Sequence, residues 1–396
     1  MRRFAVLTAI FAAVCAFSFD GIPGPKELTA KNCIIVEADT GREVWSRNPD
    51  ARAYPASTTK MMTLLLLLEN TFPTDRITAM PGVDKIKGSS LHLKPFETMT
   101  SEDLAYGLML RSANDACETV ATHISGSVTG FVQKMNERAK LIGCTKTTFN
   151  NPHGMPDKLH MTTARDLSLI AREGMKNPTF RTIVGTASYV VRRSINQKDT
   201  LIKSRNELLL KDFTMKGIKT GFTNDAGRCF VGYRVVNGIN LITVIMGCKD
   251  WEKDQVALNA WFDETFEKKT VLDVGPKFET PVNGGWNPIV KGMPKEMVEA
   301  VVPKNAAEPT TTFTAVKELA APVKVGDRIG EILVKVENGK AIRVPVFATE
   351  SVDAKPPFVA MLVSPYTFGA LGALIIAAGV FAFKLRKPKE NGMLWN

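Results

Sequence analysis

The chain has 396 residues, of which 44% are hydrophobic and 23% are charged, and its formal net charge is +11. The composition is typical of a globular protein, and the length favours two domains with appended segments. Before the extreme C-terminus, the basic residues form no dense block interleaved with aromatic residues, which disfavours nucleic-acid binding. The charge instead suits an anionic membrane or cell-wall surface.

The N-terminal stretch MRRFAVLTAIFAAVCAFS combines two arginines, an apolar run and small residues at its end. This order is typical of a secretory signal peptide, so we predict a signal over residues 1–18 with cleavage after Ser18. Lipid attachment at Cys15 is an alternative, which the bulky Val14 before it disfavours. The five cysteines that remain have no close metal-type spacing, and we predict buried free thiols rather than a disulfide framework or a zinc site.

Residues 19–275 are predicted to form one domain that begins with a strand hairpin. Apolar residues alternate over residues 31–50 around Asp39-Thr40-Gly41, which indicates that hairpin. Residues 57–69 read as a strongly apolar helix, and residues 100–175 are mostly helical in pattern.

A second hairpin is predicted at residues 227–248, where two apolar strands meet at Asn237-Gly238. Residues 254–270 then read as an amphipathic helix that closes the domain. Because the strands come from both ends of the segment, we predict a mixed sheet with helices packed on it.

After Gly275 the composition of the sequence changes to short runs rich in Pro, Gly, Val and Thr. Alternating strands surround Glu337-Asn338-Gly339, so we predict a small all-β domain over residues 276–354. Residues 355–365 are predicted to be a stiff linker that starts with Lys355-Pro356-Pro357.

The segment from Tyr366 to Phe383 carries no charge and is followed by a basic tail, residues 384–396. At about 1.5 Å per residue, the segment nearly spans a ~30 Å hydrocarbon core. We therefore predict one transmembrane helix over 366–383, with a buried core helix as the alternative. The positive-inside rule places the tail in the cytoplasm and the rest on the extracytoplasmic face of the membrane.

Ser57 and Lys60 stand at the head of the apolar helix, in the only Ser-x-x-Lys of the chain. Residues three apart share a helix face, and a helix start favours negative charge developing on a serine oxygen. A lysine kept neutral by burial or by a second cation can accept the hydroxyl proton. The pair therefore indicates a nucleophile and a general base, although so short a pattern also arises by chance.

Two further stretches carry candidate residues. Ser112 and Asn114 lie in a break between helical segments, where ordinary helix capping is the alternative. Lys219-Thr220-Gly221 lies on a strand before the second hairpin. Lysine and threonine there can bind a ligand carboxylate while glycine allows close backbone approach; a solvated edge strand is the alternative.

The three stretches occur in the order S-x-x-K, S-x-N and K-T-G, a signature of penicillin-binding proteins and class A β-lactamases. The middle one is Ser-Ala-Asn rather than Ser-Asp-Asn. Together with VEADTGREVWSRNPDARAYPASTTKMMT, RSANDACETVA, TTFNNPHGMPDKLHMTTARDLSLIA and GIKTGFTNDAGRCFVG, they make the chain resemble the serine-type D-alanyl-D-alanine carboxypeptidases over residues 32 to about 250. These are low-molecular-weight penicillin-binding proteins.

The resemblance implies an α+β fold of the penicillin-binding/β-lactamase-like transpeptidase type, with an antiparallel sheet, helices on both faces and a helical subdomain. It also implies an enzyme that removes the terminal D-alanine from peptidoglycan stem peptides and is acylated by β-lactams. No cofactor, metal or nucleic-acid partner is expected.

The resemblance also assigns roles to individual residues. Ser57 is the acylated nucleophile, Lys60 its base and Ser112 the relay of a proton to the leaving group. Asn114 holds the substrate amide, Lys219, Thr220 and Gly221 form the carboxylate-binding strand, and Lys219 is the second cation beside Lys60. The backbone N–H groups of Ser57 and Phe222 form the oxyanion hole.

Two positions depart from the family's pattern. Phe222 stands where some members carry histidine, and downstream, where the family tends to offer a carboxylate-binding arginine, this chain offers Lys249 and Lys253. Three alternatives share the motifs or the setting. They are a D,D-endopeptidase, a serine β-lactamase, which the lack of Glu in NPHGMPDKLHMTTARDL disfavours, and a catalytically idle wall-binding protein.

Overall fold

The fold is described from a computed structural model for residues 22–275, 277–336, 341–356, 373–378 and 381. The predicted signal peptide lies outside these residues, and so does most of the predicted transmembrane helix. Among the residues that are described, no helix combines the length and the apolar composition needed to cross a bilayer.

The chain divides into two compact units, and the first holds the chain up to Lys269 together with Ala300–Ala306. Its centre is a five-stranded antiparallel sheet in the order β2-β1-β9-β8-β7. The strands are β1 (Asn32–Glu37), β2 (Glu43–Arg47), β7 (Met215–Thr223), β8 (Gly227–Val236) and β9 (Ile239–Cys248). Both predicted hairpins are confirmed, β1–β2 around Gly41 and β8–β9 at Asn237-Gly238.

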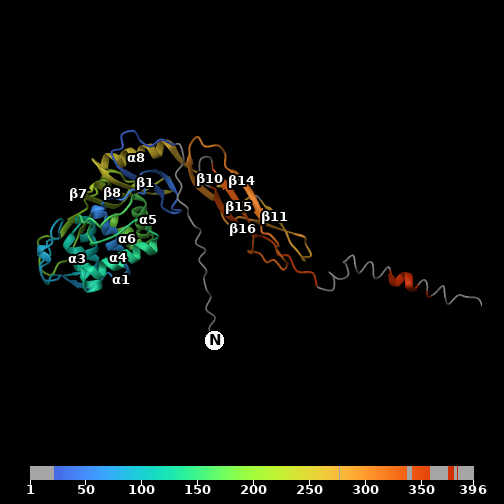
Figure 1. The fold of residues 1–396 in the computed structure, drawn as a ribbon, viewed down its shortest axis with the longest axis horizontal. Coiled ribbons are helices and arrows are strands. Elements are labelled where there is room, and N and C mark those ends of the chain that lie inside the picture. The colour runs from blue at the N-terminus through green and yellow to red at the C-terminus, as the bar shows by residue number, and fades with distance from the viewer. Residues whose placement is uncertain (1–21, 276, 337–340, 357–372, 379–380, 382–396) are drawn as a thin grey trace, which may run out of the picture. The chain divides into compact units, whose positions relative to one another are not determined.

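Both faces of this sheet are buried. Side chains alternate along a strand, so on β1 Ile34 enters one hydrophobic core and Ile35 enters the other. Helix α5 (Ala164–Lys176) packs on β1 and β9 in the first core, and α8 (Trp251–Thr265) packs on β8 and β9 in the second. In Figure 1, α8 lies on one side of the sheet and the other long helices lie on the opposite side.

The predicted apolar helix is the axis of the helical part of this unit. It begins with one 3₁₀ turn, η1 (Ala56–Thr59), and continues as α1 (Lys60–Asn70). Every residue from Lys60 to Leu67 is buried, because α1 contacts α2, α3, α4, α5 and α6. An apolar circumference is what such a position requires.

The remaining elements of the first unit are short strands and the helices around α1. They are β3 (Arg76–Thr78), η2 (Val83–Lys85), β4 (Thr98–Thr100), α2 (Ser101–Tyr106), the π-helix η3 (Gly107–Arg111), α3 (Asn114–Ser125), α4 (Val128–Ile142), α6 (Pro178–Val184), β5 (Ser188–Val190), β6 (Leu201–Lys203) and α7 (Leu208–Lys211). The helical pattern predicted for residues 100–175 is thus confirmed.

The predicted closing helix over residues 254–270 is wrong beyond Thr265. There α8 ends, and the chain becomes strand β10 (Phe266–Leu272), which pairs with β13 (Val298–Pro303). Phe266 adopts an extended conformation and packs its ring against Phe262 and Trp261. Aromatic packing and burial thus determine the structure here rather than the helical period of the charged residues.

Between residues 277 and 354 the described part of the second unit is all-β, as predicted for the region after Gly275. Its sheet has the order β11-β12-β16-β15-β14. The strands are β11 (Phe278–Pro281), β12 (Ile289–Met293), β14 (Thr310–Ala315), β15 (Arg328–Lys335) and β16 (Ile342–Ala348). Strands β15 and β16 pair on either side of the predicted Asn338-Gly339 turn, which itself lies outside the described residues.

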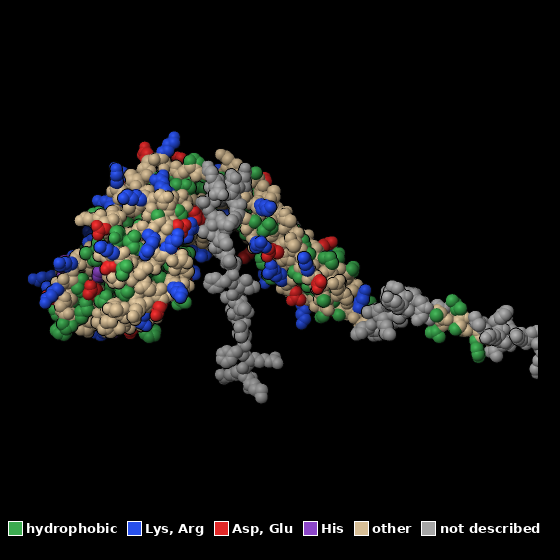
Figure 2. Space-filling view, viewed as in Figure 1, with side chains coloured by type: hydrophobic (Ala, Val, Ile, Leu, Met, Phe, Trp, Pro, Cys, Tyr) green, Lys and Arg blue, Asp and Glu red, His purple; other side chains and the backbone are tan. Residues whose placement is uncertain are grey.

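The described surface mixes charges of both signs, in line with the lack of a dense basic block in the sequence before its extreme C-terminus. On the face shown in Figure 2, Lys and Arg side chains are interspersed with Asp and Glu over the described residues.

The five cysteines predicted to be buried are Cys33, Cys117, Cys144, Cys229 and Cys248, and all are buried free thiols.

Candidate active site

Ser57 lies on the 3₁₀ turn η1, directly before helix α1. The backbone N–H of Lys60 donates to the carbonyl oxygen of Ser57, so one helical turn sets the spacing between the two residues. The Nζ atom of Lys60 lies 3.1 Å from the Oγ atom of Ser57. The two side chains of the predicted pair are therefore within proton-transfer distance.

The Lys60 amine has two further neighbours. Its Nζ donates to Oδ1 of Asn114 and to the carbonyl oxygen of His153, each at 2.8 Å. Both of these oxygens can only accept. A neutral amine that donates to both has one lone pair left, and the remaining neighbour is the Ser57 hydroxyl. The contacts thus favour Lys60 as the acceptor of the Ser57 proton.

Burial changes the protonation of this lysine. Lys60 is fully buried, and burial lowers the pKa of its amine to about 8. The positive charge of Arg205 contributes to this lowering. Arg205 is thus a neighbouring cation in addition to the predicted Lys219. Burial and the charges of Lys60 and Arg205 in turn lower the pKa of Lys219 well below its usual range.

The segment 150–160 supplies the His153 carbonyl and lies against the start of the helix. A Cβ atom at Gly154, where φ is +91°, would lie 1.7 Å from the carbonyl oxygen of Ala56, so glycine is required there. Thr63 on α1 also donates to the carbonyl oxygen of Pro152 at 2.5 Å. This segment, for which the sequence analysis assigned no role, therefore holds one of the three partners of Lys60.

The two histidines of this segment are structural in their contacts. The N–H of Asn150 donates to Nδ1 of His160, so Nε2–H of His160 donates to Oγ1 of Thr59 at 2.8 Å. Burial lowers the pKa of His160 to about 4, and the imidazole is neutral. His153 contacts Glu118 through Nε2 at 3.2 Å.

Within the described part of the chain, no group of three or more His, Cys, Asp or Glu side chains is placed to hold a metal.

Ser112 and Asn114 come from the break before α3, as the sequence predicts. Ser112 ends the π-helix η3 in a left-handed conformation, with φ of 62°, and lines the same cavity as Ser57. The Asn114 side chain is held at both ends, because Oδ1 accepts from Lys60 and Nδ2 donates to the carbonyl oxygen of Lys87 at 2.8 Å. Asn114 thus orients Lys60 in addition to any contact with substrate.

Strand β7 forms the opposite wall of the site at the free edge of the sheet. A Cβ atom at Gly221 would lie 3.0 Å from the backbone nitrogen of Ser57, so β7 approaches η1 closely only because this residue is glycine. Lys219 is buried, and its Nζ donates to the carbonyl oxygen of Thr220 at 2.9 Å. Phe222, by contrast, is exposed, at 59% of its surface.

These elements enclose a cavity of about 310 Å³. Its lining residues are Ser57, Ser89, Ser112, Arg205, Thr220, Gly221, Phe222, Arg228 and Trp251. Two arginines and no acidic side chain are among them, so the cavity suits an anionic ligand. Arg205 and Arg228 were missed from the sequence, although the register of the β7–β8 hairpin places Arg228 directly opposite Phe222.

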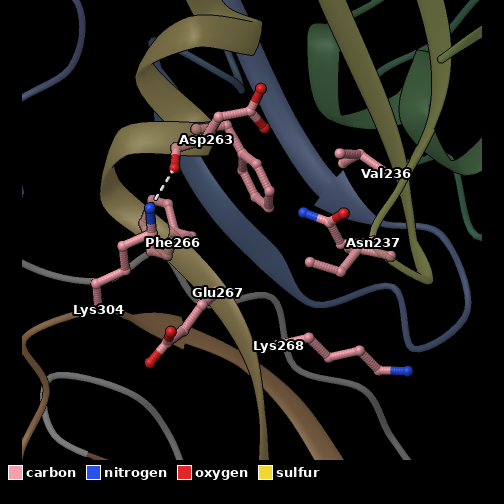
Figure 3. A pocket seen from close by; sticks show the side chains of 9 residues that line it. Val236, Asn237, Asp263, Phe266, Glu267, Lys268 and Lys304 are labelled. Carbon is pink, nitrogen blue, oxygen red and sulfur yellow. Dashed lines mark hydrogen bonds between the residues drawn. The ribbon is translucent and has the colours of Figure 1, made fainter. Parts of the chain in front are cut away.

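A second cavity, of about 320 Å³, lies between the β8–β9 turn and the end of α8 (Figure 3). Two of its polar residues are already engaged: Lys304 donates to the carbonyl oxygen of Asp263 at 2.7 Å, and the Asp263 carboxylate pairs with Arg234 at 2.6 Å. None of the predicted site residues lines it. The cavity beside Ser57 is therefore the candidate active site.

The fold and this site define the class of protein. A serine hydroxyl hydrogen-bonded to a buried lysine of lowered pKa, in a cavity lined by arginines, is the arrangement of a serine hydrolase with a lysine base.

Comparisons with known proteins identify the family. Residues 21–250 match Peptidase_S11, the D-alanyl-D-alanine carboxypeptidases, and residues 266–354 match the C-terminal domain of penicillin-binding protein 5. The chain therefore belongs to the D-alanyl-D-alanine carboxypeptidase family.

Three similar proteins illustrate the match. D-alanyl-D-alanine carboxypeptidase DacF of Bacillus subtilis is 27% identical over 84% of this chain and 88% of its own length. A D-alanyl-D-alanine endopeptidase of Pseudomonas aeruginosa is 27% identical over 61% of this chain and 80% of its own. The structure of penicillin-binding protein 5 from Haemophilus influenzae is 26% identical, with a TM-score of 0.71, over 84% of this chain and 100% of its own.

The predicted family, enzyme class and penicillin-binding fold are thus confirmed. The protein is a serine peptidase of the D-alanyl-D-alanine carboxypeptidase family.

Proposed function

We propose that this enzyme removes the terminal D-alanine from peptidoglycan stem peptides and that Ser57 carries the acyl group in this reaction. The observation behind this proposal is the contact set of Lys60, whose amine can donate to Asn114 and His153 while it accepts from Ser57. Lys60 takes the hydroxyl proton, and Oγ of Ser57 forms a bond to the carbonyl carbon of the penultimate D-alanine. The backbone N–H groups of Ser57 and Phe222 stabilise the resulting oxyanion. The close approach of Gly221 to the Ser57 nitrogen supports this placement.

The intermediate collapses when the peptide C–N bond breaks. The proton held by Lys60 passes through the Ser112 hydroxyl to the amine of the departing D-alanine, and an ester on Ser57 remains. In the second half-reaction a water molecule gives a proton to Lys60 and adds to the ester carbonyl. The ester C–O bond then breaks, and Ser57 recovers its proton. A β-lactam enters the same first step, because opening its ring leaves an ester on Ser57.

The substrate carboxylate is bound beside Thr220. Lys219 is buried next to this residue, and Arg205 lines the same cavity. A charge-assisted hydrogen bond from a guanidinium such as that of Arg205 is among the stronger polar contacts in proteins. Asn114, which already holds Lys60, also contacts the substrate amide in this proposal.

The direct experiment is to incubate the purified protein with a pentapeptide that ends in D-Ala-D-Ala and to measure released D-alanine. Release by the wild-type protein, together with a covalent ester on Ser57 located by peptide mapping after treatment with penicillin, is the expected result. D-Alanine release accompanied by an ester on another serine would contradict the assignment of Ser57.

A second activity, D,D-endopeptidase cleavage of cross-links, is favoured by the similarity to the Pseudomonas aeruginosa endopeptidase. Both reactions use the same acyl-enzyme and differ in the leaving amine. Incubation with a cross-linked dimeric muropeptide separates them, because only an endopeptidase converts the dimer to monomers.

We also propose that the enzyme is exported by residues 1–18 and held at the extracytoplasmic face of the membrane by residues 366–383. Under this proposal residues 19–275 are the catalytic domain, residues 276–354 the β domain, residues 355–365 the linker and residues 384–396 the cytoplasmic tail. The support is the uncharged stretch before a basic tail. Extraction of membranes with alkaline carbonate tests the anchor, because a membrane-spanning protein stays in the pellet.

A further inference from the structure

Arg228 stands at the mouth of the active-site cavity and has no role in the reaction described so far. It lies on β8 directly opposite Phe222 of β7, and its guanidinium carbon is 5.7 Å from the centre of the Phe222 ring. Both side chains are exposed, and both line the cavity that contains Ser57. Arg228 is thus a solvent-accessible cation held over an aromatic ring at the entrance to the site.

The guanidinium of Arg228 lacks an acidic partner within the described part of the chain. Other arginines of the first unit, such as Arg165, Arg193 and Arg234, pair with carboxylates at 2.6 to 2.8 Å. Arg205, the second arginine of the cavity, donates to Oγ of Ser89 at 2.8 Å. Of the two cations in the cavity lining, Arg205 thus gives one donor to Ser89, whereas the Arg228 side chain keeps all its donors for a ligand.

The strand register shows which part of a ligand Arg228 can reach. Thr220 pairs with Phe230, and Phe222 pairs with Arg228, so Thr220 and Arg228 are diagonal neighbours on the same face of the β7–β8 pair. Diagonal neighbours lie about 7–8 Å apart, within reach of a long side chain. A carboxylate bound at the Thr220 hydroxyl would therefore lie within reach of Arg228, in a cavity that Arg205 also lines.

We infer that Arg228 is a specificity-determining residue that binds the terminal carboxylate of the substrate. This inference rests on the proposed binding of that carboxylate at Thr220. The sequence analysis expected a further carboxylate-binding cation downstream of β9, where this chain has Lys249 and Lys253. Neither lysine lines the cavity, whereas Arg228 does, so no cation from that position is needed.

The test compares Arg228→Gln with the wild-type enzyme on two substrates, an acyl-D-Ala-D-Ala peptide with a free carboxylate and the same peptide as its C-terminal amide. We expect Arg228→Gln to lower kcat/KM for the free acid roughly tenfold to a hundredfold, mainly through KM, as for the loss of a charge-assisted hydrogen bond. The amide should be hydrolysed equally by both enzymes. Arg228→Lys should recover part of the loss, because it keeps the charge and loses the bidentate geometry.

Lys253→Gln is the matched control, since it removes one exposed positive charge near Trp251 and does not line the cavity. It should leave kcat/KM unchanged for both substrates. A defect of Arg228→Gln that is equal for acid and amide would overturn the inference. So would a defect that appears only when the acyl portion of the peptide carries an acidic side chain, because Arg228 would then bind a different carboxylate.

Failure of the catalytic proposal is distinguishable from failure of this inference. If Ser57 is not the acylated residue, the wild-type enzyme shows no ester on Ser57 with either substrate or penicillin. If only the role of Arg228 is wrong, the wild-type ester forms normally and the acid and amide defects coincide. Phe222→Leu gives a second measurement in a variant that keeps the charge, and it should weaken the preference for the acid less than Arg228→Gln does.

Discussion

The inner end and the mouth of the active-site cavity are built in different ways. At the inner end, Lys60 is fully buried, and its amine contacts groups from η1, α3 and the segment 150–160. At the mouth, Phe222 and Arg228 are exposed, and their mutual contact is a cation over a ring. Proton transfer requires atoms held at fixed separations, whereas recognition of a charged terminus tolerates adjustment. Substitutions at the inner end should therefore abolish turnover, and substitutions at the mouth should change preference.

Of the substitutions at the inner end of the cavity, replacing the nucleophile should reduce activity most. Ser57→Ala should reduce D-alanine release by roughly 10³-fold or more, because no other group can form the ester. Labelling by a fluorescent penicillin should disappear while the circular dichroism spectrum stays unchanged. Ser89→Ala, which removes a hydroxyl from the same cavity, is the control and should retain labelling. Labelling of folded Ser57→Ala would show that another residue is acylated.

Gly221→Ala tests how closely β7 must approach the nucleophile. The new Cβ atom would lie 3.0 Å from the Ser57 nitrogen and 3.1 Å from the Ala56 Cβ, so β7 must shift away from η1. We expect kcat to fall about 100-fold, in line with the loss of one oxyanion-hole donor. Gly275→Ala is the control, since a Cβ there meets no atom within 4 Å. A kcat equal to that of the wild-type enzyme would remove Gly221 from the oxyanion hole.

The pH dependence of acylation reports the state of Lys60. Since burial lowers the pKa of Lys60 to about 8, the neutral and active form increases as the pH rises from 7 to 9. The acylation rate should rise over that range. Arg205→Gln removes a charge that lowers this pKa, so the rise should move to higher pH. NMR titration of Lys60 in both proteins measures the shift. A rate that falls from pH 7 to 9 in folded protein would exclude Lys60 as the base.

Truncation of the tail should have the smallest effect on chemistry. A chain that stops at Ala354 keeps every residue of the cavity and both five-stranded sheets. It should hydrolyse a small D-Ala-D-Ala peptide at the wild-type rate and be found in the soluble fraction after export. Reduced kcat in the folded truncation would show that residues after Ala354 contribute to catalysis as well as to attachment.

The sequence predicted the inner end of the cavity better than its mouth. Ser57 and Lys60 are three residues apart on one helix, so local geometry was sufficient to pair them. Both hairpins were predictable because Asn-Gly and Asp-Thr-Gly turns are local signals. The end of α8 at Thr265 was not, because its aromatic contacts with Phe266 are tertiary. Arg205 and the His153 carbonyl join Lys60 through packing between distant segments, which no spacing rule reveals.

The mouth could have been predicted in part. Once the β7–β8 hairpin is recognised, counting across its turn places Arg228 opposite Phe222. Whether that side chain has an acidic partner depends on the whole surface, and that information is in the structure alone.

The partners of Lys60 also have a consequence for the chain while it folds. Asn114 is 54 positions away from Lys60, and His153 is 93 positions away. Strand β7, which closes the other wall, follows later still. A nascent or unfolded chain therefore contains an ordinary, unreactive serine, because contacts this far apart in sequence form only once most of the unit has folded. Reactivity of Ser57 toward a labelled penicillin thus measures the fraction of enzyme that has completed folding, and the hydrolase stays inactive until then.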